Sequence, residues 1–529
     1  MKVLLLAAML LPAPPVAGPP AAPASAVVHT DHGLVRGTVT GRHRTFQGIP
    51  YAAPPVRSLR WRAPQPVVPW SGVRDATKPG APCAQQPSAD PTVVDPREDC
   101  LYLNVTTPVA RGVRRPVIVW LHGGAFQTGT GSAYDAHRLA EQGGAVVVTI
   151  NYRLGVFGYF GLPGLPGTGT FGLQDQQAAL RWVRANAAAF GGDPHNVTLA
   201  GQSAGGLSVC AQLTSPGAAG LFDKAIIQSG SCLTSWPAGL FFGMPAGSQW
   251  SNRPAVEDAG TRLAGKLGCG VTSYAATSDG GVGASADPLG CLRATPAADL
   301  TAATAGAGQA AFTLPAYGTP VLPRNPADAL RAGVFHRLPV LSGSTRDEFR
   351  GFLGAVDEWA PYSAQQYTDA LTAAFGDQAG RVAARYPVSA YGNRPGLAWA
   401  AVATDRMWAC PTLAGDRLLA RHTAVYGYEF AEQHGPALDA TYPWGASHGY
   451  ELPYLFDGIR WLTGTAQPGL ADEMVRVWAG FAATGTPSWP RMSARARTPY
   501  VRGLASGATG SVDLAAEHRC DFWATVPDA

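Results

Sequence analysis

The chain lacks the features that would place it in a membrane, on nucleic acid or around a metal ion. After the first residues, no stretch reaches the roughly 18 consecutive apolar residues that a membrane-spanning helix needs. The net charge is +4 and the basic residues form no stripe, which excludes nucleic acid as a partner. The eight cysteines form no C-x-x-C pair and no cluster with histidine, so the sequence predicts neither a metal site nor a cofactor.

The N-terminus and the cysteines indicate export. Lys2 precedes an apolar run, Val3 to Leu11, and a Pro/Ala-rich stretch that ends in Ala24-Ser-Ala26. This order is typical of a signal peptide, with cleavage expected after Ala26. An even number of cysteines in an exported protein favours disulfides. We therefore predict that residues 1–26 are a signal peptide and that the mature chain is secreted.

The most informative segment is a strand that runs directly into a serine. The apolar stretch from Val197 leads into Gly201-Gln-Ser-Ala-Gly205 and then into a helix-like stretch, Leu207 to Leu213. A G-x-S-x-G motif between a strand and a helix is the setting of a nucleophile elbow. The tight turn tolerates only small residues on either side and lifts the hydroxyl clear of the sheet. The pattern predicts that Ser203 is a nucleophile.

A serine nucleophile needs hydrogen-bond donors for the oxyanion, and a second strand supplies candidates. The buried-strand pattern of residues 116–121 ends in His122-Gly-Gly-Ala-Phe126, where two glycines expose backbone N–H groups. We predict that the amides of Gly123 and Gly124, together with that of Ala204, bind the oxyanion. His122 directly precedes these donors and is expected to shape the loop by hydrogen bonding.

The acid and the base should follow the serine, because this kind of fold orders its triad as serine, acid and histidine. A strand over residues 338–344 runs into Thr345-Arg-Asp-Glu348, where Asp347 and Glu348 both fit by spacing. Four later histidines are candidates for the base: His422, His434, His448 and His518. We predict His448, because it lies in a glycine-flanked loop before an aromatic segment, whereas His422 follows an exposed helical pattern and His434 lies in a polar turn.

Taken together, these motifs resemble the type-B carboxylesterase/lipase family, the esterase branch of the α/β-hydrolases that also contains the cholinesterases. Further matching segments extend over nearly the whole chain. They are Phe46-Gln-Gly-Ile-Pro-Tyr-Ala-Ala-Pro-Pro55, Glu98-Asp-Cys-Leu-Tyr-Leu-Asn-Val105, Asn151-Tyr-Arg-Leu-Gly155, Gly172-Leu-Gln-Asp-Gln176, Phe190-Gly-Gly-Asp-Pro194 and Gln228-Ser-Gly230. The resemblance implies an α/β-hydrolase fold: a central, mostly parallel, twisted sheet flanked by helices, with large insertions.

The resemblance also implies roles that spacing alone leaves open. It makes Glu348 the acid of the triad and Ser229 a serine that hydrogen-bonds within the active site. Two buried ion pairs are implied: Arg60 with Glu98, and Arg153 with Asp175. Three disulfides are implied: Cys83–Cys100, Cys269–Cys291 and Cys410–Cys520. Cys210 and Cys232 are then left over, either as a fourth bridge or as buried free thiols.

One position departs from the family pattern. A glutamate usually precedes the nucleophile, whereas Gln202 stands there in this chain. Glutamine keeps the shape and the hydrogen bonds but not the negative charge. The matching loop of the cholinesterases carries a key tryptophan, yet the residues between Cys83 and Cys100 include no aromatic side chain. Both losses weaken the binding of a cationic substrate and predict a preference for neutral esters of small to medium size.

We expect a single domain over residues 27–529, because strand-like and helix-like segments alternate from Leu34 onward without a linker-like gap. The Gly/Ala-rich stretch Ala275 to Ala311 is expected to be a surface insertion. The predicted function is that of a secreted serine carboxylester hydrolase, which forms an acyl-enzyme and needs only its small-molecule ester substrate and water.

Two rival functions fit the sequence less well. A lipase on aggregated lipid would need an amphipathic lid, but the Ala84–Asp99 loop is short and polar. A non-catalytic adhesion module would have lost the nucleophile or the base, but all three triad positions are filled.

Overall fold

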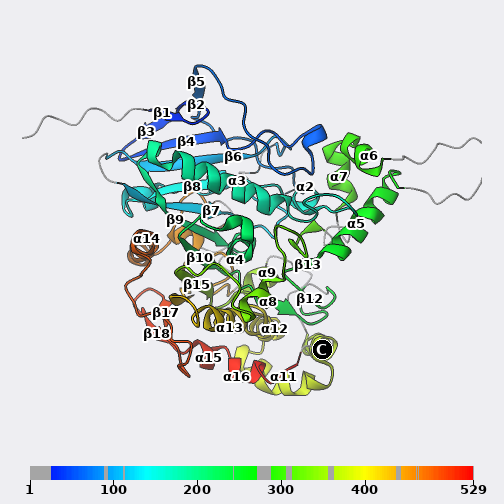
Figure 1. The fold of residues 1–529 in the computed structure, drawn as a ribbon. Coiled ribbons are helices and arrows are strands. Elements are labelled where there is room, and N and C mark those ends of the chain that lie inside the picture. Colours follow the sequence, from blue (N-terminus) through cyan, green and yellow to red (C-terminus); the bar gives the residue numbers. More distant parts are fainter. Residues whose placement is uncertain are drawn as a thin grey trace, which may run out of the picture.

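A mixed sheet of 11 strands runs through the centre of the computed structural model (Figure 1). The structure describes residues 26–527 apart from ten short gaps: 88–92, 94, 111–113, 242–243, 271–286, 306–311, 355–362, 436–442, 460–461 and 463. The predicted signal peptide, except for Ala26, lies outside the described residues. In the described part of the chain, no helix is long and apolar enough to cross a membrane.

The strands of this sheet follow the order β18-β17-β16-β15-β10-β9-β7-β8-β6-β4-β3. The six pairings from β17 to β8 are parallel, and the pairings at both edges are antiparallel. The strands are β3 (Thr38–Thr40), β4 (His43–Pro50), β6 (Tyr102–Pro108), β7 (Arg115–Leu121), β8 (Val146–Ile150), β9 (Gly192–Gln202), β10 (Lys224–Gln228), β15 (Val340–Thr345), β16 (Val425–Phe430), β17 (Val501–Leu504) and β18 (Gly510–Val512). A smaller sheet joins β1 (Val27–Thr30), β2 (Gly33–Arg36) and β5 (Val73–Asp75).

Both faces of the central strands are buried, which explains their continuous apolar sequences. In β7, Val117, Val119 and Leu121 enter one hydrophobic core, while Ile118 and Trp120 enter the other. Helices α3 (Phe171–Asn186), α4 (Ala204–Thr214) and α13 (Cys410–Leu419) contribute apolar residues to the first core. Helices α1 (His137–Glu141) and α14 (Pro468–Thr484) contribute to the second.

The carboxyl ends of four neighbouring parallel strands meet at one edge of the sheet. Their register pairs Leu121 with Gly201, Gln202 with Gln228, and Gln228 with Gly343. The loops that leave β7, β9, β10 and β15 therefore begin side by side. In open sheets of this kind, ligands bind beyond the carboxyl ends of the strands.

Insertions after β10 build two further groups of helices. The first comprises α5 (Arg253–Lys266), α6 (Pro288–Ala294) and α7 (Ala297–Ala303), which lie together at one side of the molecule in Figure 1. Within the predicted surface insertion, Leu292 and Leu300 are fully buried in a hydrophobic cluster that also contains Trp61 and Phe160, so the described part of that stretch is helix packed on distant segments. The second group comprises α9 (Arg350–Gly354), α10 (Ala364–Phe375), α11 (Ala379–Arg385) and α12 (Pro395–Thr404).

All eight cysteines are bridged, as Cys83–Cys100, Cys210–Cys232, Cys269–Cys291 and Cys410–Cys520. The pair that the resemblance leaves open, Cys210 and Cys232, thus forms a disulfide between α4 and the loop after β10. Both implied ion pairs are present. The Arg60 guanidinium binds both oxygens of Glu98 and also donates to the backbone of Leu292 and Thr295, which fastens α6 to the Cys83–Cys100 loop.

Candidate active site

Ser203 lies at the turn between β9 and α4 with a left-handed backbone, φ 57° and ψ −123°. Such a conformation costs a residue other than glycine about 1–3 kcal/mol, so the surrounding structure must hold it. A Cβ on Gly201 would lie 2.5 Å from the backbone of Gly205, and a Cβ on Gly205 would lie 2.0 Å from the Leu121 oxygen. The two glycines are therefore required by close backbone packing, as the elbow motif predicts.

The loop after β7 passes directly beside this elbow. A Cβ on Gly123 would lie 3.1 Å from the Cβ of Ser203. Gly124 and Ala125 both have positive φ, 107° and 54°. Among the described residues, none accepts a hydrogen bond from the N–H of Gly123, Gly124, Ala125 or Ala204. Ala125 is not among the predicted donors, although its place directly after the two glycines is a signal for a further donor.

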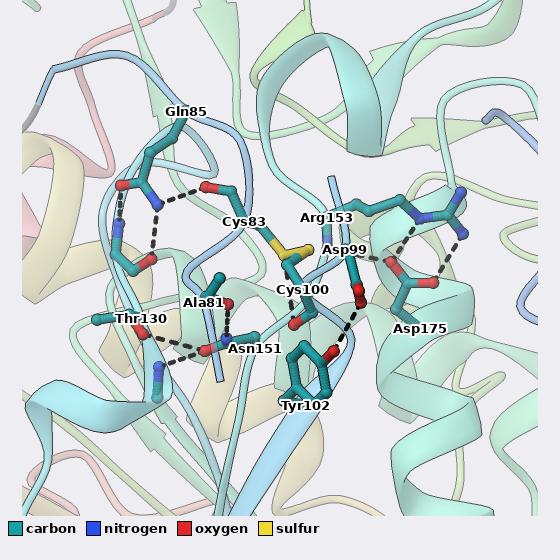
Figure 2. The surroundings of a disulfide bond; sticks show 12 residues. Ala81, Cys83, Gln85, Asp99, Cys100, Tyr102, Thr130, Asn151, Arg153 and Asp175 are labelled. Carbon is teal, nitrogen blue, oxygen red and sulfur yellow. Dashed lines mark hydrogen bonds and ion pairs between the residues drawn. A yellow bond between two sulfur atoms is a disulfide. The ribbon is translucent and has the colours of Figure 1, made fainter. Parts of the chain in front are cut away.

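Two clamps hold this loop in shape. His122 is buried, its Nδ1 donates to the Gly123 oxygen at 2.8 Å, and its ring stacks on Tyr152. Gln85, just after Cys83, both donates to and accepts from the backbone of Gly129, at 3.0 and 2.8 Å. In the view of Figure 2, this amide and the Arg153–Asp175 ion pair lie on either side of the Cys83–Cys100 disulfide. His122 therefore shapes the loop, as expected, and the disulfide loop supports it from outside.

Glu348 and Asp347 follow β15 but face different partners. Glu348 is fully buried, and its two carboxylate oxygens accept hydrogen bonds from the Thr345 amide and from Nδ1 of His448. Asp347 instead accepts from the Ala446 amide at 3.0 Å and pairs with Arg350 at 2.9 Å. Asp347 thus holds the base of the loop that carries His448, whereas Glu348 contacts the imidazole itself.

His448 is the candidate histidine that reaches the elbow. Its Nε2 lies 3.2 Å from the amide nitrogen of Gln202, the residue before Ser203. The other three lie elsewhere: His422 is exposed, the His434 side chain is 89% exposed, and His518 is buried in a separate cluster. Burial tends to lower the pKa of His448, but the charge and hydrogen bond of Glu348 outweigh burial and raise that pKa above its ordinary value of 6.5.

A second buried carboxyl group lies close to the first. Glu451 is 1% exposed and accepts a hydrogen bond from the Gln228 amide at 3.2 Å. Burial and the nearby charge of Glu348 raise the pKa of Glu451 to about 7. Glu451 is not among the predicted site residues, because its burial beside Glu348 does not follow from a local sequence pattern.

Ser229 is buried at the end of β10, with positive φ. Among the described residues its hydroxyl has no hydrogen-bond partner, so the bond implied by the family resemblance is not formed.

Aromatic side chains lie against His448, and a mostly apolar cleft lies nearby. Phe352 and Trp408 face the imidazole of His448, with ring centroids 5.0 and 6.0 Å away. A small cleft, open to solvent, lies beside the Gly123–Phe126 loop rather than on Ser203 itself. Its polar lining is entirely uncharged: Gln85, Gln86, Gln127, Thr301, Thr304 and Thr313.

Comparison with known proteins decides the family. The model of the Carboxylesterase family matches residues 24–523. The chain belongs to this carboxylesterase family. It is 34% identical over 505 residues to the para-nitrobenzyl esterase of Bacillus subtilis, which covers 90% of this chain and 94% of that relative. It is 32% identical over 536 residues to the cocaine esterase of Oryctolagus cuniculus, covering 93% of each chain.

The solved structures agree with the sequence comparison. A structure of PNB esterase superposes with a TM-score of 0.74 at 32% identity, covering 93% of this chain and 99% of that one. The predicted family and the α/β fold class are therefore confirmed, and the carboxylesterase is a carboxylic ester hydrolase.

Proposed function

We propose that this carboxylesterase cleaves neutral esters through an acyl-enzyme on Ser203, with His448 as the base and Glu348 as its acid. The observation that carries the proposal is the hydrogen-bonded line from Glu348 through His448 to Gln202, the neighbour of Ser203 at the elbow. Since the elbow presents the hydroxyl beyond the sheet, the imidazole and the serine share one site at the strand ends.

The reaction follows from this geometry. Ser203 Oγ attacks the ester carbonyl while His448 Nε2 accepts its proton, and the imidazolium then gives that proton to the leaving alcohol. Glu348 on Nδ1 fixes the tautomer that leaves Nε2 free to accept, and it stabilises the cation that forms. Water then attacks the acyl-enzyme by the same steps and releases the acid.

The oxyanion would be bound by the backbone amides of Gly123, Gly124 and Ala204, with Ala125 as a further donor. These N–H groups have no acceptor among the described residues, so they are free to bind a developing negative charge. The clamps at His122 and Gln85 fix the loop before substrate arrives, which reduces the reorganisation needed in the transition state.

The substrate class rests on two features: an uncharged residue directly before the nucleophile and a cleft without charged side chains. Gln202 replaces a carboxylate next to the nucleophile, and the cleft beside the oxyanion loop has a lining without charged side chains. Two relatives are named for para-nitrobenzyl esters and for cocaine. We therefore propose neutral esters of small to medium size, and a para-nitrobenzyl ester is a suitable first test substrate.

The location and the domain organisation complete the proposal. Residues 1–26 would direct export, and residues 27–529 would act outside the cell as one domain. The four disulfides support this, because such bonds persist in oxidising compartments.

The test of the proposed chemistry is Ser203→Ala. Loss of the nucleophile should lower kcat on a para-nitrobenzyl ester by on the order of 10⁶, with an unchanged circular dichroism spectrum. A purified variant that retains more than a few per cent of the wild-type rate would contradict the assignment.

A further inference from the structure

A cluster of three potential metal ligands includes none of the proposed catalytic residues. It joins Glu429 on β16 to Glu517 at the end of α15 (Leu514–Glu517) and to the next residue, His518. One ligand atom from each of the three lies within 4.8 Å of the other two. The proposed reaction uses none of these side chains.

His518 is held as metal-binding histidines are held. It is 3% exposed, and its Nδ1 lies 2.5 Å from Oδ1 of Asp405. A carboxylate on one ring nitrogen orients the imidazole and increases the basicity of the other nitrogen toward a metal. That other nitrogen, Nε2, faces Oε1 of Glu429 at 2.6 Å.

Glu429 provides an independent indication of a ligand. The residue is fully buried, yet Oε2 of its carboxylate has no hydrogen-bond partner among the described residues. Leaving a buried carboxylate oxygen unpaired is costly, and a bound cation would remove that cost. This carboxylate is the one that already faces His518.

Glu517 supplies the third ligand and an entry path. Its side chain is 38% exposed, and its ion-pair contact among the described residues is with Arg346, at the long distance of 3.9 Å. The negative charge of the nearby Asp405 is paired with Arg519, whose guanidinium nitrogen lies 3.4 Å from the carboxylate. The two glutamates therefore bring two negative charges to the cluster, which match one divalent cation.

We propose that His518 Nε2, Glu429 and Glu517 bind one divalent transition-metal ion, with Zn²⁺ as the best match to one nitrogen and two carboxylate ligands. Zinc–ligand bonds of about 2.1 Å place tetrahedral ligand atoms about 3.4 Å apart. Reaching that geometry needs Glu517 to turn inward and His518 and Glu429 to separate by less than an ångström. The exposed side leaves room for water as a fourth ligand.

The ion would fasten the C-terminal segment to the body of the protein. Glu429 lies on the central sheet, Asp405 lies at the start of the helical turn Asp405–Ala409, and the Cys410–Cys520 disulfide crosses between the same two regions. The site is thus structural, and its loss should reduce stability rather than remove the proposed esterase chemistry.

The test measures bound metal and thermal stability on the full secreted chain. The protein is stripped with a chelator, incubated with Zn²⁺ and passed through a desalting column, and zinc is counted by mass spectrometry. We expect about one zinc per chain and a rise in Tm of about 2–5 °C. Glu517→Gln should reduce the bound zinc at least tenfold and remove the rise in Tm. Asp521→Asn, an exposed acid of the same segment, should change neither.

Two outcomes would overturn the proposal. The first is a wild-type protein with less than 0.1 zinc per chain and no shift in Tm, which would mean that a proton alone joins His518 to its two carboxylates. The second is a Glu517→Gln protein that binds as much zinc as the wild type, with Glu429→Gln doing the same.

Discussion

At the scale of single residues, the surroundings of His448 control the chemistry. The His448 side chain is 13% exposed and lies between the Glu348 carboxylate, the Gln202 amide and the aromatic side chains of Phe352 and Trp408. Burial favours the neutral imidazole, which is the form that can act as a base. The carboxylate opposes burial and favours the cation, which is the form that the reaction generates.

The first prediction concerns pH. Because His448 must be neutral to accept the serine proton, kcat/KM for a neutral ester should rise with pH and level off, with a midpoint above 6.5. Glu451→Gln removes a nearby negative charge and should move that midpoint to lower pH. A midpoint below 6.5, or one that Glu451→Gln moves upward, would contradict this account.

The raised pKa of His448 affects activity and stability in opposite directions as the pH rises. Since the folded-state pKa of His448 is raised, the ionised His448–Glu348 interaction stabilises the fold fully below the unfolded-state pKa. Its contribution is lost as pH rises through the folded-state pKa. This contribution therefore decreases over the range in which activity increases.

The second prediction separates the two acids after β15. Glu348→Gln removes the carboxylate that orients the imidazole and should lower kcat by on the order of 10²–10⁴. Asp347→Asn acts only through the base of the His448 loop and should lower kcat by a clearly smaller factor. The measurement is kcat on one ester for both purified variants, and the reverse ranking would make Asp347 the acid.

The third prediction concerns charge beside the nucleophile. The wild-type enzyme should hydrolyse a neutral thioester with higher kcat/KM than a thiocholine ester of the same acyl chain. Gln202→Glu adds the missing carboxylate and should shift the ratio toward the cationic substrate. A tenfold wild-type preference for thiocholine, about 1.4 kcal/mol, would reveal a cation site that the uncharged lining does not provide.

At the scale of elements, buried ion pairs fix the loops that support the site. Arg153 follows β8, is buried, and binds Asp175 of α3 through two side-chain hydrogen bonds of 2.7 Å each. The Asp175 carboxylate also accepts from the backbone N–H of Arg153 at 3.0 Å. This pair therefore joins the strand end to the helix that covers the sheet.

The fourth prediction follows from that burial. Asp175→Asn leaves the guanidinium without its charge partner and should lower the free energy of unfolding by about 3–5 kcal/mol. Asp328→Asn, which breaks the exposed pair with Arg331, should change it by less than about 1 kcal/mol. Denaturant unfolding of both variants compares them, and equal effects would mean that Asp175 has no special structural role.

Strands and the elbow could be predicted from the sequence, because they depend on local patterns. The apolar stretch at 116–121 lies within β7, and the G-x-S-x-G motif forms the turn between β9 and α4. The helices within Ala275 to Ala311 could not be predicted, since their core depends on single leucines that pack on distant segments. The family pattern was needed to choose between Asp347 and Glu348 as the acid of the triad, because both residues directly follow the predicted strand and fit the spacing of a triad acid.

At the scale of the whole molecule, contacts between segments that are distant in the sequence form side-chain clusters that local sequence patterns do not show. Glu429 and His518 are 89 residues apart and meet only because β16 and the C-terminal helices pack together. The absence of a metal motif in the sequence therefore says nothing about such a cluster. Glu451 is likewise recognised only when its burial beside Glu348 is known.

The fifth prediction concerns the four bridges and export. Mass mapping of the unreduced, exported protein should recover all four disulfides, including Cys210–Cys232. In the loop-entropy account, Cys83–Cys100 contributes about 3 kcal/mol and the longer Cys410–Cys520 loop about 4–5 kcal/mol, both as upper estimates. Free thiols at either pair in exported protein would contradict the disulfide assignment.

The most direct test of the central claim is to identify the residue that a fluorophosphonate labels. The account predicts one adduct per chain, mapped to Ser203, with complete loss of activity. Ser203→Ala should take up no label, and His448→Ala should label far more slowly. Stoichiometric labelling of another residue together with loss of activity, or full activity after Ser203 is labelled, would contradict the account.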